Sequence, residues 1–332
     1  MSMSESAPEE PLSSWLSSNG NESSLSRANE KRNYRIYEGL GHVLITMVRP
    51  MYAKESVPGV FLPDYEIFAL DSTTISCSIK LLTWALGKYS KGAVKMHTLL
   101  DLRGSIPAFI HVTHGKWHDS NVLDIMEPTP FAIYTMDKAY VDFAALYRID
   151  QGDAYFVTRA KDNMQFEVIE KNYNLDEATG LRGDYTIRLT GYKPSCLYPK
   201  NFRMIEYYDF ESEEELRFIT NNFEISALEV SNIYRNRWQI EVFFKWIKQN
   251  LTIKTLWGHT ENAVKTHLWT ALCTYLIVAR IKATYKSPYS VTECATLLSV
   301  SALEKTDIKE LLTLTEPLNQ NQNVKERNLF DF

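Results

Sequence analysis

The sequence contains few cysteines, and no two of them are close together. The four cysteines, Cys77, Cys196, Cys273 and Cys294, form no CxxC pair. Neither a disulfide framework nor a cysteine zinc site is indicated, and a reducing compartment fits this composition. The first residues, MSMSESAPEE, are acidic and lack the apolar stretch of a signal peptide.

Long apolar runs and an overall positive charge are also lacking. The longest apolar run, from Leu268 to Ala279, is too short to cross a bilayer and predicts a buried helix. Lys and Arg number 36 against 41 acids, a net charge of −5, which excludes a globally basic nucleic-acid binder. Nine basic residues against two acids nevertheless lie between Tyr234 and Lys286, and five against one between Lys80 and Gly104. Two basic stretches in an acidic chain suggest an anionic partner.

The remaining pattern predicts a mixed α/β domain. A chain of 332 residues suggests two or three domains. Apolar segments at 67–70, 93–102 and 108–112 predict an antiparallel meander, and helix and strand then alternate as far as residue 158. The expected organisation is a disordered tail at 1–26, a helical lead-in at 27–62 whose helix ends at Pro50, an α/β domain at 63–160 and 218–290, an inserted β-rich subdomain at 161–217, and C-terminal helices with a tail at 291–332.

Three acids stand out by position. Asp71 ends the first apolar strand, in FALDSTT, and Asp137 ends another, in FAIYTMDKAY. Glu241 lies in the helical stretch YRNRWQIEVFFKWIKQN. Carboxylates that converge at a sheet edge would bind Mg²⁺ or Mn²⁺, because hard cations prefer oxygen ligands.

The helical stretch predicts two distinct faces if it is continuous. Tyr234, Arg237, Glu241, Lys245 and Lys248 then fall within an arc of roughly 80°. The adjoining arc is apolar and consists of Ile240, Phe243, Phe244, Ile247 and Leu251. An ion-pair ladder would explain a carboxylate among three cations, but it leaves the excess positive charge unexplained. Trp238, at the edge of the polar face, is either a core residue or a stacking partner for an unpaired base.

The spacing of four of these residues resembles a known signature. Tyr234, Arg237, Glu241 and Lys248 reproduce the Y-(2)-R-(3)-E-(6)-K pattern of the IS-four family of bacterial insertion-sequence transposases. The blocks ALDST, KGAVKMHTLLDLRG and MDKAYVDF also resemble that family, in the right order, over about residues 27–315.

The resemblance implies a DDE-type transposase with a ribonuclease H-like fold: a mixed sheet flanked by helices and interrupted by a β-rich insert. It implies that Asp71, Asp137 and Glu241 hold two Mg²⁺ or Mn²⁺ ions, which act in in-line phosphodiester displacement. The DNA-binding residues it implies are Tyr234, Arg237, Trp238, Lys245 and Lys248. The expected partners are transposon inverted repeats, target DNA and a second copy of the chain, in the bacterial cytoplasm at the nucleoid.

Two alternatives remain open at this point. Family members usually carry a helical DNA-binding region before the first catalytic Asp, and residues 1–26 do not resemble it. The chain could therefore be an N-terminally truncated, non-catalytic copy that binds or inhibits full-length copies. It could also be another ribonuclease H-like nuclease, although Tyr234, Arg237 and Lys248 would then lack a purpose.

Other polar residues have simpler interpretations. Three histidines at 111, 114 and 118 suggest zinc, but a strand offset of three points the first two to opposite faces. We expect Asp101 to be a turn acid and Asp119 a helix cap. Lys95 either contacts DNA or is a solvated lysine at a strand edge.

Overall fold

The structure is a computed structural model that describes residues 27–28, 30–77, 92–173, 175–250, 260–302 and 304–313. The predicted tail at 1–26 and the end of the chain after residue 313 lie outside these residues. The chain divides into two compact units, one comprising Gly20–Ile277 and the other containing Val278–Phe332. The candidate site lies within the first unit.

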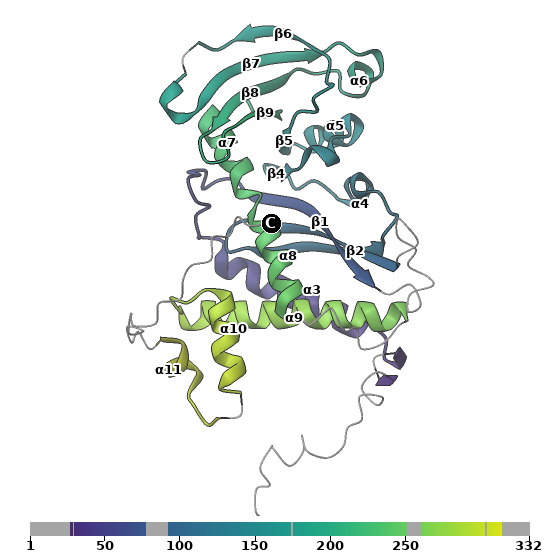
Figure 1. Ribbon diagram of the computed structural model, residues 1–332, viewed down its shortest axis with the longest axis vertical. Helices are drawn as coiled ribbons and strands as arrows, with labels where there is room; N and C mark the ends of the chain where they lie inside the picture. The colour runs from purple at the N-terminus through teal and green to yellow at the C-terminus, as the bar shows by residue number, and fades with distance from the viewer. Residues whose placement is uncertain are drawn as a thin grey trace, which may run out of the picture. The chain divides into compact units, whose positions relative to one another are not determined.

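The first unit contains, in its described residues, a nine-stranded mixed sheet with the order β3-β2-β1-β4-β5-β9-β8-β7-β6 (Figure 1). The strands are β1 (Ile67–Cys77), β2 (Gly92–Asp101), β3 (Ile106–His114), β4 (Ile133–Met136), β5 (Tyr155–Arg159), β6 (Phe166–Lys171), β7 (Leu181–Leu189), β8 (Phe202–Asp209) and β9 (Glu214–Thr220). β1 to β3 form an antiparallel meander, whereas β4 pairs in parallel with both β1 and β5. This confirms the predicted mixed sheet and is the arrangement expected for a ribonuclease H-like domain.

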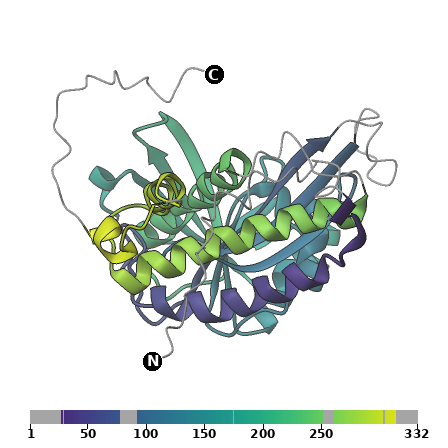
Figure 2. The same ribbon diagram turned by 90° about the horizontal axis from the view of Figure 1, so that it is seen from below.

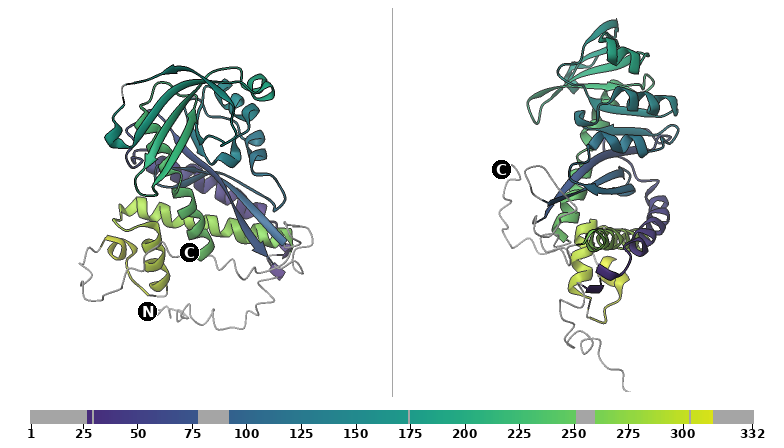
Figure 3. Two further views of the ribbon diagram at one scale, coloured as in Figure 1. Left: turned by 45° about the horizontal axis from the view of Figure 1, so that its top comes forward. Right: turned by 90° about the vertical axis from the view of Figure 1, so that its right-hand side faces the viewer.

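The strands predicted as an insert extend this sheet rather than forming a separate one. β9 pairs antiparallel with β5, and β8, β7 and β6 follow as antiparallel neighbours. Figure 3 shows β6 to β9 at one end of the sheet. The segment therefore continues the hydrogen-bonded ladder of the central strands.

Helices flank the sheet. They are α3 (Arg35–Tyr52), α4 (Val122–Ile125), α5 (Phe143–Gln151), α6 (Tyr192–Leu197), α7 (Ala227–Asn236), α8 (Gln239–Asn250) and α9 (Glu261–Tyr285), with 3₁₀ turns η2 (Asp119–Asn121), η3 (Lys138–Tyr140) and η4 (Glu177–Thr179). Phe68 and Leu70 of β1 belong to the core that Leu146 and Ile149 of α5 complete. Because side chains alternate along a strand, Ala69 and Asp71 point to the other face, where α8 contacts β1.

The segment 67–70 is buried along its whole length, as expected of an inner strand covered on both faces. The predicted buried helix is also confirmed, because Leu268, Leu272 and Leu276 of α9 are almost inaccessible to solvent. Helices α3 and α9 lie side by side (Figure 2). Gly41 permits this approach, since a Cβ there would lie 2.7 Å from the Trp269 ring. In the described residues, no helix is long and apolar enough to span a bilayer.

The prediction that the first helix ends at Pro50 is wrong, because α3 continues to Tyr52. Pro50 lies in the last turn, where the missing N–H removes one hydrogen bond without ending the helix. Tyr52 is buried against Gly104, whose φ is +75° and whose Cβ, if present, would lie 2.2 Å from the Tyr52 ring. This contact gives the extra turn a packing partner.

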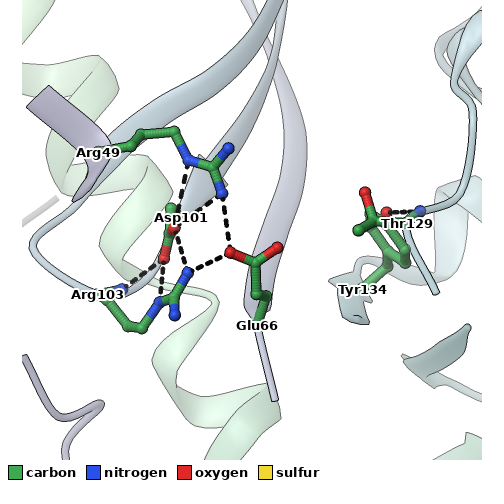
Figure 4. A network of polar contacts seen from close by, with 6 residues as sticks. All are labelled: Arg49, Glu66, Asp101, Arg103, Thr129 and Tyr134. Carbon is green, nitrogen blue, oxygen red and sulfur yellow. Dashed lines mark hydrogen bonds and ion pairs between the residues drawn. The ribbon is translucent and has the colours of Figure 1, made fainter. Parts of the chain in front are cut away.

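Asp101 has a larger role than that of a turn acid. It is 2% exposed at the end of β2 and accepts hydrogen bonds from the Arg103 side chain and from Arg49 Nη2 at 3.2 Å. Both arginines also contact Glu66, which closes a network of two acids and two arginines (Figure 4). The network links α3 both to the start of β1 and to the turn between β2 and β3.

The second unit contains the end of α9 together with α10 (Val291–Val300) and α11 (Ile308–Thr313), where the sequence predicts C-terminal helices. Ser290 and Glu293 form a capping box at the start of α10. Val278, Cys294 and Leu312 form a small core of this unit.

Candidate active site

The first two predicted acids lie side by side on neighbouring parallel strands. The prediction that Asp71 ends its strand is wrong, because β1 continues to Cys77, whereas Asp137 directly follows β4 as predicted. Leu70 of β1 is in register with Met136 of β4, and each is followed directly by an acid, Asp71 and Asp137. The next strand, β5, continues this row, because Thr158 is in register with Met136 and Arg159 follows it. Sequence reasoning missed Arg159, although it holds the same place after its apolar strand as the two acids do.

The helical segment that carries the third acid is not continuous, so that prediction was wrong. α7 ends at Asn236 and α8 begins at Gln239, with Arg237 and Trp238 between them. Backbone hydrogen bonds there span three residues, from Ile240 N to Arg237 O at 3.1 Å and from Glu241 N to Trp238 O at 3.0 Å. Such tighter 3₁₀ bonding changes the direction of the chain between the two helices.

Arg237 nevertheless joins two of the predicted acids. Its Nη1 lies 3.2 Å from Asp71 Oδ2 and its Nη2 lies 2.8 Å from Glu241 Oε1. The Tyr234 hydroxyl donates to Asp137 Oδ1 at 3.5 Å, and the Arg237 guanidinium lies 5.8 Å from the Tyr234 ring centre. One arginine and one tyrosine thus link the three acids at a single site.

The remaining predicted residues lie beside this group. Lys245 and Lys248 line a pocket of about 530 Å³ together with Asp71 and Glu241. Trp238 is 60% exposed and is therefore not a core residue. The predicted apolar face is confirmed for the described residues Ile240, Phe243, Phe244 and Ile247, which are all buried, whereas Leu251 lies outside the described residues.

Burial dominates the electrostatics of the site. It raises the pKa of Asp71 to about 6, against the opposing effects of the Ser72 N–H and Arg237, and the nearby Glu241 and Asp137 carboxylates raise it further. Burial also raises the pKa of Tyr234 to about 12. For Arg237, burial opposes the charge, but Tyr234, Asp71 and Glu241 outweigh it and raise the pKa. The site therefore holds a protonated guanidinium between two partly buried acids, Asp71 and Glu241, whose side chains are 22% and 35% exposed.

The donor set fits a hard divalent cation. The available ligands are carboxylate oxygens, which Mg²⁺ and Mn²⁺ prefer. A positive group, the Arg237 guanidinium, already lies between Asp71 and Glu241, as a cation shared by them would. Among the described residues, no three His, Cys, Asp or Glu side chains come close enough together to hold one metal ion.

Asp119 and Lys95 differ from their predicted roles. The cap of η2 is His118, whose ring accepts from Ser120 N, and Asp119 instead contacts Ser72 and Lys95. Lys95 is not a solvated edge residue, because β2 lies between β1 and β3, and its side chain is only 16% exposed. His111 packs near the rings of His97 and Trp117. The packing of η2 against β1 and β2, which the local sequence pattern does not contain, gives Asp119 these contacts.

The structure therefore combines a mixed sheet flanked by helices with three acids that Arg237 and Tyr234 link on one side of it. Residues 62–277 match the family described as the transposase DDE domain, and the chain belongs to this family.

Named relatives agree with this assignment. The chain is 33% identical over 211 residues to a probable transposase for insertion sequence element IS5377 of Geobacillus stearothermophilus, and 30% identical over 212 residues to the putative transposase y4zB of Sinorhizobium fredii. Each match covers 63% of this chain, and the chain spans little more than half of these relatives, 55% and 59% of their lengths. Among solved structures, the cryo-EM structure of a piggyBac transposase synaptic complex with hairpin DNA aligns at 9% identity and a TM-score of 0.41, over 79% of this chain and 60% of that one.

Proposed function

We propose that this protein cleaves DNA phosphodiesters at transposon ends and transfers the cut strand to target DNA. The observation that carries the proposal is the convergence of Asp71, Asp137 and Glu241 around Arg237 and Tyr234. Family membership supports the same activity. A non-catalytic copy is not favoured, because no acid of the site has been lost.

Asp71, Asp137 and Glu241 would hold two divalent cations, Mg²⁺ or Mn²⁺. When bound, such cations activate water or a 3′-hydroxyl and stabilise the leaving oxygen of an in-line displacement. The protein supplies acidic ligands on two rigid strands and one helix. Arg237 holds Asp71 and Glu241 close together, because a guanidinium with five donors can serve both carboxylates at once.

The basic and aromatic residues near the acids would bind the DNA. Lys245 and Lys248 line the pocket beside Asp71 and attract the phosphate backbone. Tyr234 and Arg237 would contact phosphates near the cut end. The exposed ring of Trp238 would stack on an unpaired base. We expect the protein to act as a homodimer on paired transposon ends, at the bacterial nucleoid.

The test is cleavage of a labelled duplex that ends in the inverted repeat flanking the gene for this chain. Wild-type protein should nick it with Mg²⁺ or Mn²⁺ and not with EDTA. Glu241→Gln should lower the rate by at least about 100-fold, because it removes a ligand charge at nearly constant shape. Glu261→Gln is the matched control, since Glu261 also pairs with a cation four residues away, Lys265, but on α9. Failure of the folded wild type with both metals, or full activity of Glu241→Gln, would contradict the proposal.

A further inference from the structure

A polar network lies on the face of β1 opposite the three acids. Asp71 and Ser72 are consecutive in one strand, so their side chains point to opposite faces of the sheet. Asp71 contacts Arg237, whereas the Ser72 hydroxyl donates to Asp119 Oδ1 at 2.6 Å. The proposed chemistry assigns no role to Asp119.

Asp119 is held in place from several sides. Lys95 Nζ donates to both of its oxygens, at 2.9 and 3.0 Å, and also to Trp117 O at 3.2 Å. His97, which is in register with Ser72 across β1 and β2, lies 3.9 Å from Asp119 Oδ1 and is completely buried. The Asp119 carboxylate therefore has a fixed position, and it fixes the Ser72 hydroxyl in turn.

The same serine holds the Asp71 carboxylate through its backbone. Ser72 N donates to Asp71 Oδ1 at 2.7 Å, while Arg237 occupies Oδ2. The two anchors of Asp71 thus come from different elements, one from Arg237 between α7 and α8 and one from the strand itself. Of these two contacts, only the one from Ser72 is connected to Asp119. The backbone N–H of Ser72 binds Asp71, and its hydroxyl binds Asp119.

We propose that Asp119 is a positioning residue for Asp71: through the Ser72 hydroxyl it holds the backbone N–H that orients the Asp71 carboxylate. The ammonium of Lys95 balances the negative charge of Asp119, which lies on the face of β1 opposite Asp71. The proposal rests on the function proposed above. Capping of η2 does not explain Asp119, since His118 already supplies the cap.

The experiment compares Asp119→Asn and Ser72→Ala with wild type, by two independent readouts on the full chain. The first is Mn²⁺ binding, from the electron paramagnetic resonance signal of free Mn²⁺. The second is kcat and KM for nicking of the inverted-repeat duplex. Mutation of a residue that holds a metal ligand in place typically costs about 10- to 100-fold in metal affinity or activity. Both variants should therefore weaken Mn²⁺ binding and lower kcat on this scale. The KM for DNA should be unchanged.

Three further variants separate positioning from general destabilisation. Ser72→Thr keeps the hydroxyl on a residue that strands accept, so it should bind Mn²⁺ as the wild type does. Asp124→Asn is the matched control, because Asp124 lies close by in α4 and pairs with Arg148 while 64% exposed. The double variant Ser72→Ala with Asp119→Asn should lose no more than one single variant, since both changes break one contact.

The outcomes also separate this inference from the proposed function. Wild-type Mn²⁺ binding in folded Ser72→Ala and Asp119→Asn would overturn the positioning role. An equal loss in Ser72→Thr would overturn it too, since the hydroxyl would then be irrelevant. If Asp119→Asn does not fold, Ser72→Ala alone tests the positioning role. It removes the same hydrogen bond without changing any charge. If wild type binds Mn²⁺ but cuts no DNA, the proposed function fails while a selective loss of Mn²⁺ binding still supports Asp119.

Discussion

Arg237 and Asp71 are 166 residues apart in the sequence, yet Arg237 Nη1 lies 3.2 Å from Asp71 Oδ2. The other end of the same guanidinium binds Glu241 on α8. Two partly buried acids from different elements therefore share one cation. Removing that cation leaves them to repel each other unless another positive charge takes its place.

Replacing Arg237 by methionine should make stability depend on divalent metal. In EDTA, we expect the free energy of unfolding to fall by about 2 kcal/mol, because two charged hydrogen bonds are lost. Mg²⁺ should stabilise this variant more than it stabilises wild type. Urea unfolding with and without Mg²⁺ measures both effects. Arg148→Met, which removes an exposed pair with Asp124, is the control and should change little. An Arg237 variant that responds to Mg²⁺ as wild type does would refute the expectation.

Loss of the buried pair in the β7–β8 region should be more costly. Arg203 donates to both oxygens of Asp184 at 2.9 Å, and their side chains are 10% and 5% exposed. Arg203→Met should lower the free energy of unfolding by about 3–5 kcal/mol, because it leaves an unpaired buried charge. Urea unfolding provides the measurement. Arg188→Met is the control on β7, where Glu167 lies 3.9 Å away and both side chains are half exposed. Equal effects of the two substitutions would contradict this view.

Removing the exposed ring of Trp238 should affect DNA binding and leave stability unchanged. Base stacking on an aromatic side chain is worth about 1–3 kcal/mol, so Trp238→Ala should weaken binding about tenfold to a duplex with an unpaired terminal base. Fluorescence anisotropy of a labelled duplex measures the affinity. Phe61→Ala removes another exposed aromatic, 85% accessible and not part of the pocket that Asp71 and Glu241 line, and should bind normally. Unchanged affinity of Trp238→Ala would remove Trp238 from the DNA-binding residues.

Burial of His97 should make the protein less stable in mild acid. Burial lowers the pKa of His97 from 6.5 to about 4, so the folded state holds it neutral where the unfolded chain is protonated. As pH falls from 7 to 5, this group should therefore reduce the free energy of unfolding by about 2 kcal/mol, and the effect should level off below about pH 4. Urea unfolding at several pH values tests this. His97→Gln should flatten the dependence, and His42→Gln measures the effect of losing an exposed histidine. Parallel curves for wild type and His97→Gln would contradict the assignment.

The sequence predicts those parts of the fold that local patterns determine. An apolar run such as 67–70 indicates a buried strand segment, and an acid directly after such a run marks where the strand stops being covered on both faces. Asp71, Asp137 and Glu241 could be selected in this way and by their spacing. Their role as metal ligands stays a prediction.

Other features depend on contacts between distant segments. The residues at the break between α7 and α8, Arg237 and Trp238, do not disfavour a helix, so composition could not predict the interruption. The meander of β1, β2 and β3 could be predicted, but the contact between Asp119 and Ser72 also requires knowing which face of β1 η2 covers. The local sequence pattern does not contain this placement of η2.

The position of β6 offers a practical use. It is the outermost strand of the sheet, and five of its six residues are exposed. Five strand spacings, about 24 Å, separate it from β4, the strand that Asp137 follows. A fluorescent dye attached at Glu170→Cys, after replacement of Cys77 and the exposed Cys196, would report DNA binding without crowding the acids.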